Sequence, residues 1–143
     1  MANIVPFSFK GELASGTHNF ASGGNTFKLA LYTANPYTTS STTKVATSEV
    51  SSAGGSNYTA GGNTLTGQTV TASTATTAID FADTSWSSAT FTAAFGAIYD
   101  TRASDKLVVF LDFGGNKTAT NGTFTIAFPD PSTPSNAIIS ITS

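Results

Sequence analysis

Two runs of alternating apolar residues, joined by a short polar stretch, constrain the fold more than any other feature. The alternating residues are Phe91, Ala93, Phe95, Ala97 and Tyr99 in the first run and Leu107, Val109, Leu111 and Phe113 in the second. A period of two is that of a β-strand with one buried face. Residues 100–105 between the runs are polar and suited to a turn, so the sequence predicts a long antiparallel hairpin with one apolar face turned inward. We expect this hairpin to be the centre of an all-β domain.

Further strand patterns lie on both sides of the hairpin. They are expected at residues 26–33, 45–50, 68–72, 78–82, 123–128 and 137–142. Two glycine–asparagine clusters, at residues 114–116 and 121–122, are expected to frame a turn after the hairpin. One short helix is expected at residues 8–14, with Gly16 as its stop. Together the patterns predict a β-sandwich or jelly roll of about eight strands with one short N-terminal helix.

The length of 143 residues fits a single domain, 1–143, that can bury its own core. Residues 1–8 are apolar but lie outside the strand pattern, so they are either an arm that reaches a neighbour or an edge strand. Residues 34–43 contain too few apolar side chains to pack, and an exposed loop is expected there. Residues 51–67 are dense in glycine, serine and asparagine, with Tyr58 and Leu65 as their expected anchors.

Composition excludes several classes of function. The chain has no cysteine, which excludes disulfides, cysteine–zinc sites and thiol nucleophiles. Charged residues make up 10% of the chain and the formal net charge is -2, so nothing favours nucleic acid or an anionic membrane as a partner. The first residues do not resemble a signal peptide, and no apolar stretch approaches the roughly 18 residues of a membrane helix. We therefore expect a protein made and kept in a cytoplasm until it assembles with something else.

Few side chains are suited to catalysis. His18 is the single histidine, and it is expected to bond a backbone carbonyl or to lie at the edge of the core. Five aspartates, Asp80, Asp83, Asp100, Asp105 and Asp112, lie around the hairpin, where capping of backbone amides is favoured over a Ca²⁺ site. No catalytic residue, cofactor or metal is expected, and the chain is not expected to be an enzyme.

Trp86 is the single tryptophan, and it opens the hairpin. A core or interface position is favoured for it. The alternative is a platform on which a sugar ring stacks, but such binding modules usually offer more than one exposed aromatic ring.

Several segments carry a resemblance that spans almost the whole chain in order. They are SFKGEL, GTHNF, TFKLALYT, NYTAGGNTL, IDFADTSWSSATFTAAFGAIYD, VFLDFGGNKTATNGTFTIAFP and AIISI. This succession resembles a family of small structural proteins of tailed bacteriophages. The resemblance implies a non-enzymatic virion component, a capsid decoration or cement protein on the outer capsid surface, made in the host cytoplasm. It also implies that the chain self-associates as a dimer or trimer and binds the major capsid protein at joints between capsomers.

The residues expected at such an interface are Ile4, Val5, Phe7, Tyr37, Tyr58 and Trp86. Two other classes of function are kept as alternatives. A tail- or fibre-associated adhesin would bind host glycans through exposed aromatic rings around Trp86. A small hydrolase would depend on His18.

Overall fold

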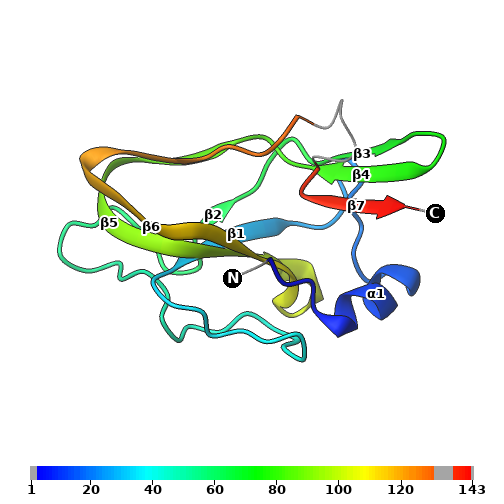
Figure 1. The fold of residues 1–143 in the computed structure, drawn as a ribbon, viewed down its shortest axis with the longest axis horizontal. Helices are drawn as coiled ribbons and strands as arrows, with labels where there is room; N and C mark the ends of the chain where they lie inside the picture. The colour runs from blue at the N-terminus through cyan, green and yellow to red at the C-terminus, as the bar shows by residue number, and fades with distance from the viewer. Residues whose placement is uncertain (1–2, 131–136, 143) are drawn as a thin grey trace.

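The computed structural model describes residues 3–130 and 137–142, and these form two antiparallel sheets and one short α-helix (Figure 1). The elements in chain order are α1 (Phe7–Ala14), β1 (Phe27–Tyr32), β2 (Asn63–Thr64), β3 (Thr69–Ala72), β4 (Thr76–Asp80), β5 (Thr84–Asp100), the 3-10 helix η1 (Thr101–Ala103), β6 (Lys106–Ile126) and β7 (Ile139–Thr142). One sheet has the order β2-β1-β5-β6 and the other β3-β4-β7. The predicted all-β sandwich with one short helix is confirmed. This strand order does not establish the jelly-roll alternative.

The main core contains side chains from both sheets. Buried residues of β1, β4, β5, β6 and β7 form one apolar cluster, to which Phe9 of α1 and Phe20 also belong. The ring of Phe20 stacks on Phe27 of β1, with 4.4 Å between centroids. The helix is therefore held against the sandwich through its single fully buried side chain, Phe9. Within the described residues, no helix is long and apolar enough to cross a membrane.

The predicted hairpin is β5 with β6, and it is much longer than its alternating runs. Residues 114–122 do not make the expected turn, because β6 continues through them to Ile126. Their glycines are used in a bulge: Gly114 and Gly115 have φ of +73° and +130°. There β6 advances five residues, from Asp112 to Lys117, while β5 advances two, from Phe95 to Ala93.

A second irregularity lies farther along the hairpin, where Asn121 has φ of +48° and the register with β5 shifts between Ala89 and Phe91. In Figure 1 the pair of strands curls round at one end of the molecule, and the second arm returns above the first. We call residues 106–118 of β6, the lower run, its first arm and residues 123–126, the upper run, its second arm.

The bulge also breaks the predicted shared face of residues 91–99. Phe91 and Ala93 belong to the main core, whereas Ala97 and Tyr99 belong to a second apolar cluster, with Phe95 packed against it. The prediction of one apolar face is therefore wrong, because the irregularity between Ala93 and Phe95 turns the following side chains to the opposite side. Both faces of the hairpin are buried near its turn.

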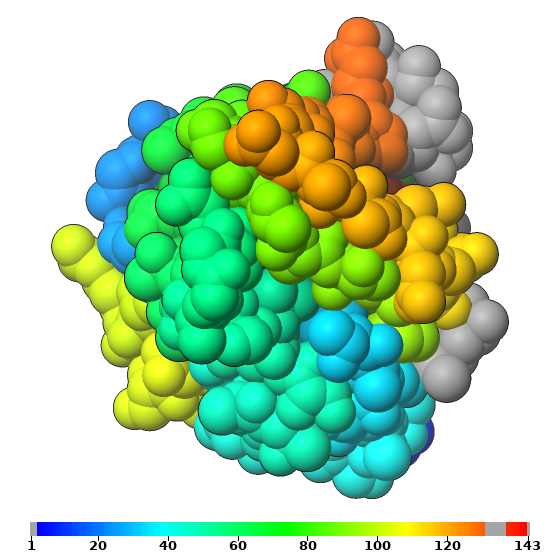
Figure 2. Space-filling view, turned by 90° about the vertical axis from the view of Figure 1, so that its left-hand side faces the viewer, coloured from blue at the N-terminus to red at the C-terminus, as the bar shows by residue number. Residues whose placement is uncertain are grey.

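The second face is covered by Tyr37, which is buried although most other residues of its loop, 34–43, are exposed as expected. Tyr37 is 4% exposed, and its ring lies 4.9 Å from that of Phe110. The strand expected at 45–50 does not form; Glu49 makes only an isolated bridge to Tyr32, beside Ser48 with φ of +61°. Figure 2 shows residues 35–60, in cyan to green, as a broad area below the bend of the hairpin.

All four tyrosines are buried, and their hydroxyls fasten the loops to the sheet. Tyr58 accepts a hydrogen bond from the backbone N–H of Leu31 at 3.0 Å and donates one to Glu49 at 2.8 Å. Tyr99 donates to the carbonyl of Gly61 at 2.7 Å. Tyr58 and Leu65 are buried, which confirms them as anchors of the glycine-rich segment.

The described part of the N-terminal segment lies along the edge of β6. Ile4 and Phe110 exchange two backbone hydrogen bonds of 2.8 Å, and the side chain of Asn3 accepts from the backbone N–H of Asp112 at 2.9 Å. This arrangement favours the edge-strand interpretation over a free arm. Residues 1–2 lie outside the described part of the chain.

Candidate functional site

A buried polar cluster joins α1 to the turn of the hairpin. His18 Nδ1 lies 2.9 Å from Asp100 Oδ2, and His18 Nε2 lies 3.0 Å from Glu12 Oε2. The side chains of His18 and Asp100 are both fully buried. Lys106 Nζ donates to Glu12 Oε1 at 2.7 Å, and Asn25 Nδ2 donates to Asp100 Oδ2 at 2.6 Å. The cluster connects residues 12–25 to the turn of the hairpin at residues 100–106, which is distant in sequence.

This cluster is built to hold the fold together. The partners of His18 are two carboxylates, where a backbone carbonyl was expected. Both ring nitrogens are engaged, so neither is free to take a proton from a nucleophile. Desolvation opposes ionisation of Glu12, but the hydrogen bonds from Lys106 and His18 outweigh it and hold the pKa of Glu12 below its usual value. Among the described residues, no group of three or more metal-ligating side chains is placed to hold a metal ion.

The structure places three of the expected interface residues in the interior. Tyr37, Tyr58 and Trp86 are each at most 4% exposed. Trp86 packs among Tyr58, Phe91 and Phe124, with ring centroids 6.1 to 6.2 Å away. These three residues therefore present no surface to a partner, and their place in the candidate interface is corrected.

The other three expected interface residues lie in the N-terminal segment. Val5 is 40% exposed and Phe7 is 67% exposed, whereas Ile4 is partly buried against the second cluster. They remain available as contacts, but they lie on either side of the buried Pro6.

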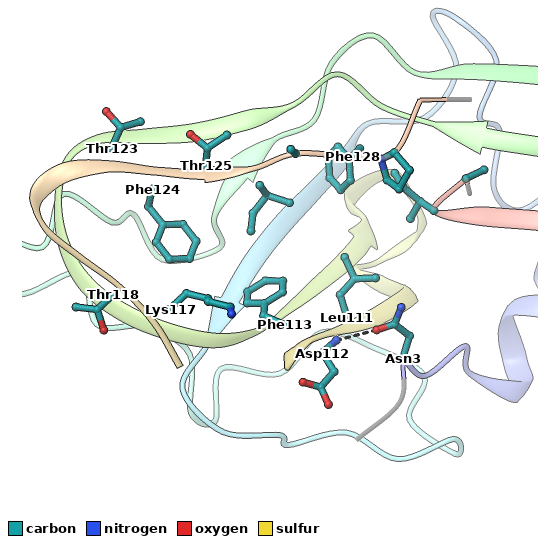
Figure 3. Close-up of a pocket in the computed structure, with 15 residues that line it drawn as sticks. Asn3, Leu111, Asp112, Phe113, Lys117, Thr118, Thr123, Phe124, Thr125 and Phe128 are labelled. Carbon is teal, nitrogen blue, oxygen red and sulfur yellow. Dashed lines mark hydrogen bonds between the residues drawn. The ribbon is translucent and has the colours of Figure 1, made fainter. Parts of the chain in front are cut away.

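A cavity of about 610 Å³ lies between the two arms of β6, and we call it the β6 groove. Its apolar walls come from both arms: Leu111 and Phe113 from the first arm, Phe124 and Ile126 from the second, and Phe128 just beyond it. Figure 3 shows the rings of Phe113 and Phe124 pointing into the space between the arms. The groove exists because β6 bends back over itself between Thr118, which Figure 3 shows on the lower run, and Thr123, which it shows on the upper run.

The groove is bordered by the edge of a sheet. β6 is the last strand in the order β2-β1-β5-β6. Within the described residues, its outer side pairs with Ile4 at Phe110 and with Thr43 at Lys106, and both contacts lie in the first arm. The backbone groups on that side of the second arm are therefore open to a further strand. Apolar walls beside an unpaired strand edge are what an extended peptide segment needs for binding.

Two charged side chains line the β6 groove, Lys117 and Asp112. Lys117 makes no ion pair with any described residue. In Figure 3 its side chain reaches into the groove towards Phe113, whereas the carboxylate of Asp112 points away. A hydrogen bond from the backbone N–H of Gly114 lowers the pKa of Asp112.

Sequence reasoning did not find this groove. Leu111 and Phe113 were expected to share the inner face of the hairpin, and Phe124 was expected to lie on a separate strand. No family model matches the sequence, and neither a curated protein nor a solved structure is detectably similar to it. The site is therefore interpreted from its geometry.

Proposed function

We propose that the chain is a non-enzymatic structural protein of a phage virion, a decoration or cement protein that binds the outside of the head and stabilises contacts between major capsid subunits. The sequence resemblance to small phage structural proteins motivates the proposal. The single structural observation that carries it is the β6 groove, an apolar recess beside the edge of β6, whose second arm pairs with no other described strand on its outer side. Such a surface is suited to docking a protein segment.

The way the loops are held also supports a structural role. The long loops between β1 and β2 are fastened by buried tyrosine hydroxyls and by the ion pair of Lys44 with Glu49. A protein that docks by shape benefits from loops that are ordered before binding, because less conformational entropy is lost on association. On a shell, many weak copies acting together would then give firm attachment.

The two alternative functions receive less support. The adhesin was expected to show exposed aromatic rings around Trp86, but Trp86 is buried and its ring neighbours Tyr58 and Phe91 are at most 8% exposed. The hydrolase would need His18 as a base, and both of its ring nitrogens already bond carboxylates. The buried rings around Trp86 do not favour glycan binding, and the bonded nitrogens of His18 do not favour a role as a general base.

The proposal is tested by fractionating purified particles of the source phage into heads and tails. We expect the chain in the head fraction, at a copy number in proportion to the major capsid protein, and in an oligomer of two or three when it is purified alone. Recovery with tails alone would support the adhesin, and absence from the particle would reject a virion role altogether.

A further inference from the structure

We propose that the β6 groove binds an extended, apolar segment that carries a carboxylate, which adds as a strand to the open edge of β6 and pairs with Lys117. The proposed occupant is a segment of the major capsid protein, so its identity rests on the proposed function. The chemistry of the occupant rests on the groove alone.

The first argument is the shape of the groove. Its walls belong to two arms of one edge strand, so an inserted strand would bond the backbone of one arm while its side chains contact both. Alternate side chains of an extended segment point to opposite faces. The side chains on one face of the inserted segment would contact Leu111 and Phe113. The side chains on its other face would contact Phe124 and Ile126. All four of these residues line the cavity.

The second argument is charge complementarity. Lys117 is the charged side chain that reaches into the groove, and among the described residues it has no acidic partner. A carboxylate on the incoming segment would neutralise it beside an apolar surface, where partial desolvation strengthens the attraction. A basic segment would be repelled at the same place, so the groove selects for acidic over basic strands.

The experiment uses the full chain and synthetic peptides about eight residues long, the length of an ordinary strand. The first peptide alternates valine with threonine and carries one central glutamate. In the second and third the glutamate is replaced by glutamine or lysine. In the fourth, prolines replace the threonines, which removes the backbone donors needed for strand pairing. Affinity is measured by calorimetry, and the binding site by backbone amide shifts in NMR spectra.

We expect the glutamate peptide to bind about two- to fivefold more tightly than the glutamine peptide, the range of an exposed ion pair, and the proline peptide not to bind. Amide shifts are expected along residues 112–126. Lys117→Glu should reverse the preference towards the lysine peptide, and the matched variant Lys10→Gln, a change of an exposed lysine on α1, should leave it unaltered. No binding, equal binding of all four peptides, or shifts confined to other strands would overturn the proposal.

Two further measurements separate this inference from the proposed function. Wild type and Lys117→Glu are mixed with heads from which the chain has been removed, and co-sedimentation is scored. Equal sedimentation of both proteins, without peptide binding, overturns the groove inference while the decoration role stands. Peptide binding without sedimentation of wild type supports the groove's chemistry and rejects the capsid as its partner. A dimer that the glutamate peptide dissociates would make a second copy the occupant and overturn the proposal.

Discussion

His18 and Asp100 lie side chain to side chain inside the protein, 82 residues apart in sequence, with 2.9 Å between Nδ1 and Oδ2. Because Glu12 bonds the other ring nitrogen, a single imidazole joins α1 to the turn of the central hairpin. The stability of that junction depends on all three groups being present.

Replacement of His18 by alanine should strongly destabilise the protein. The change leaves the fully buried side chain of Asp100 without one of its hydrogen-bond partners, and leaving a buried polar group unsatisfied costs about 1 to 3 kcal/mol. The free energy of unfolding in urea measures the loss. Lys10→Ala, on the exposed side of the same helix, is the control and should change it by less than about 0.5 kcal/mol. Equal stabilities of the two variants would contradict a structural role for His18.

Acid should weaken the same junction through Glu12. Its pKa is lowered in the folded protein, so its contribution is complete above the unfolded value of about 4.3 and is lost as the pH falls through the folded value. Unfolding free energies measured between about pH 3 and pH 6 should fall more steeply for wild type than for Glu12→Gln. Parallel curves would show that Glu12 is not coupled to folding.

Ionised Asp80 should destabilise the folded protein, in contrast to ionised Glu12, which stabilises it. Burial raises its pKa, the neighbouring charges of Asp83 and Asp130 add to the increase, and its Oδ1 is buried without a hydrogen-bond partner. The charged form is therefore unfavourable in the folded protein, and Asp80→Asn should stabilise it by about 1 kcal/mol at pH 7. The gain should shrink as the pH falls through the raised pKa, because wild-type Asp80 is then neutral as well. Thermal unfolding at neutral and acid pH checks this, and destabilisation at neutral pH would contradict it.

Gly62 is required where β2 meets β1. A β-carbon there would overlap the backbone carbonyl of Leu29, and the residue has φ of +75°. Gly62→Ala should cost about 3 kcal/mol or more, since the backbone pairing has to shift. Gly54→Ala is the matched control: it has a similar φ of +69° but nothing nearby, so only the left-handed strain of about 1 to 2 kcal/mol applies. Similar losses of unfolding free energy for the two variants, measured in urea, would show that the close approach of Gly62 to Leu29 is unimportant.

The hydroxyl of Tyr58 should contribute to the free energy of unfolding in addition to the packing of its ring. Tyr58→Phe leaves the backbone N–H of Leu31 without its acceptor and removes a bond to Glu49, which should cost about 1 to 3 kcal/mol. Thr118→Val removes an exposed hydroxyl pair with Thr92 and should be close to neutral. Urea unfolding of both variants decides the point, and a neutral Tyr58→Phe would contradict the role given to the tyrosines.

Alternation along the chain was sufficient to predict the hairpin, β1 and the sandwich, because these depend on local period and turn chemistry. It was not sufficient at Gly114 and Gly115. Glycines with positive φ serve equally in a turn and in a bulge, and only the pairing with β5 decides between them. The same bulge explains why Phe91 and Tyr99 lie on opposite faces of the hairpin.

The candidate site could not be predicted from local sequence patterns either, because it depends on tertiary contacts. The β6 groove results from the bend, which brings Phe113 and Phe124 to the same cavity. Tyr37 is buried because the second face of the hairpin needs a cover, and nothing in the polar sequence around it indicates that face. The partners of His18 are likewise set by the tertiary fold, whereas the absence of cysteine and the single histidine already narrowed the possible chemistry.

The most direct test of the proposed role is cryo-electron microscopy of the source particle, with this chain fitted to the map. We expect ordered copies on the outer surface of the head, with the β6 groove occupied by an extended segment of a major capsid subunit. Density for the chain only at the tail, or none on the particle, would contradict the account.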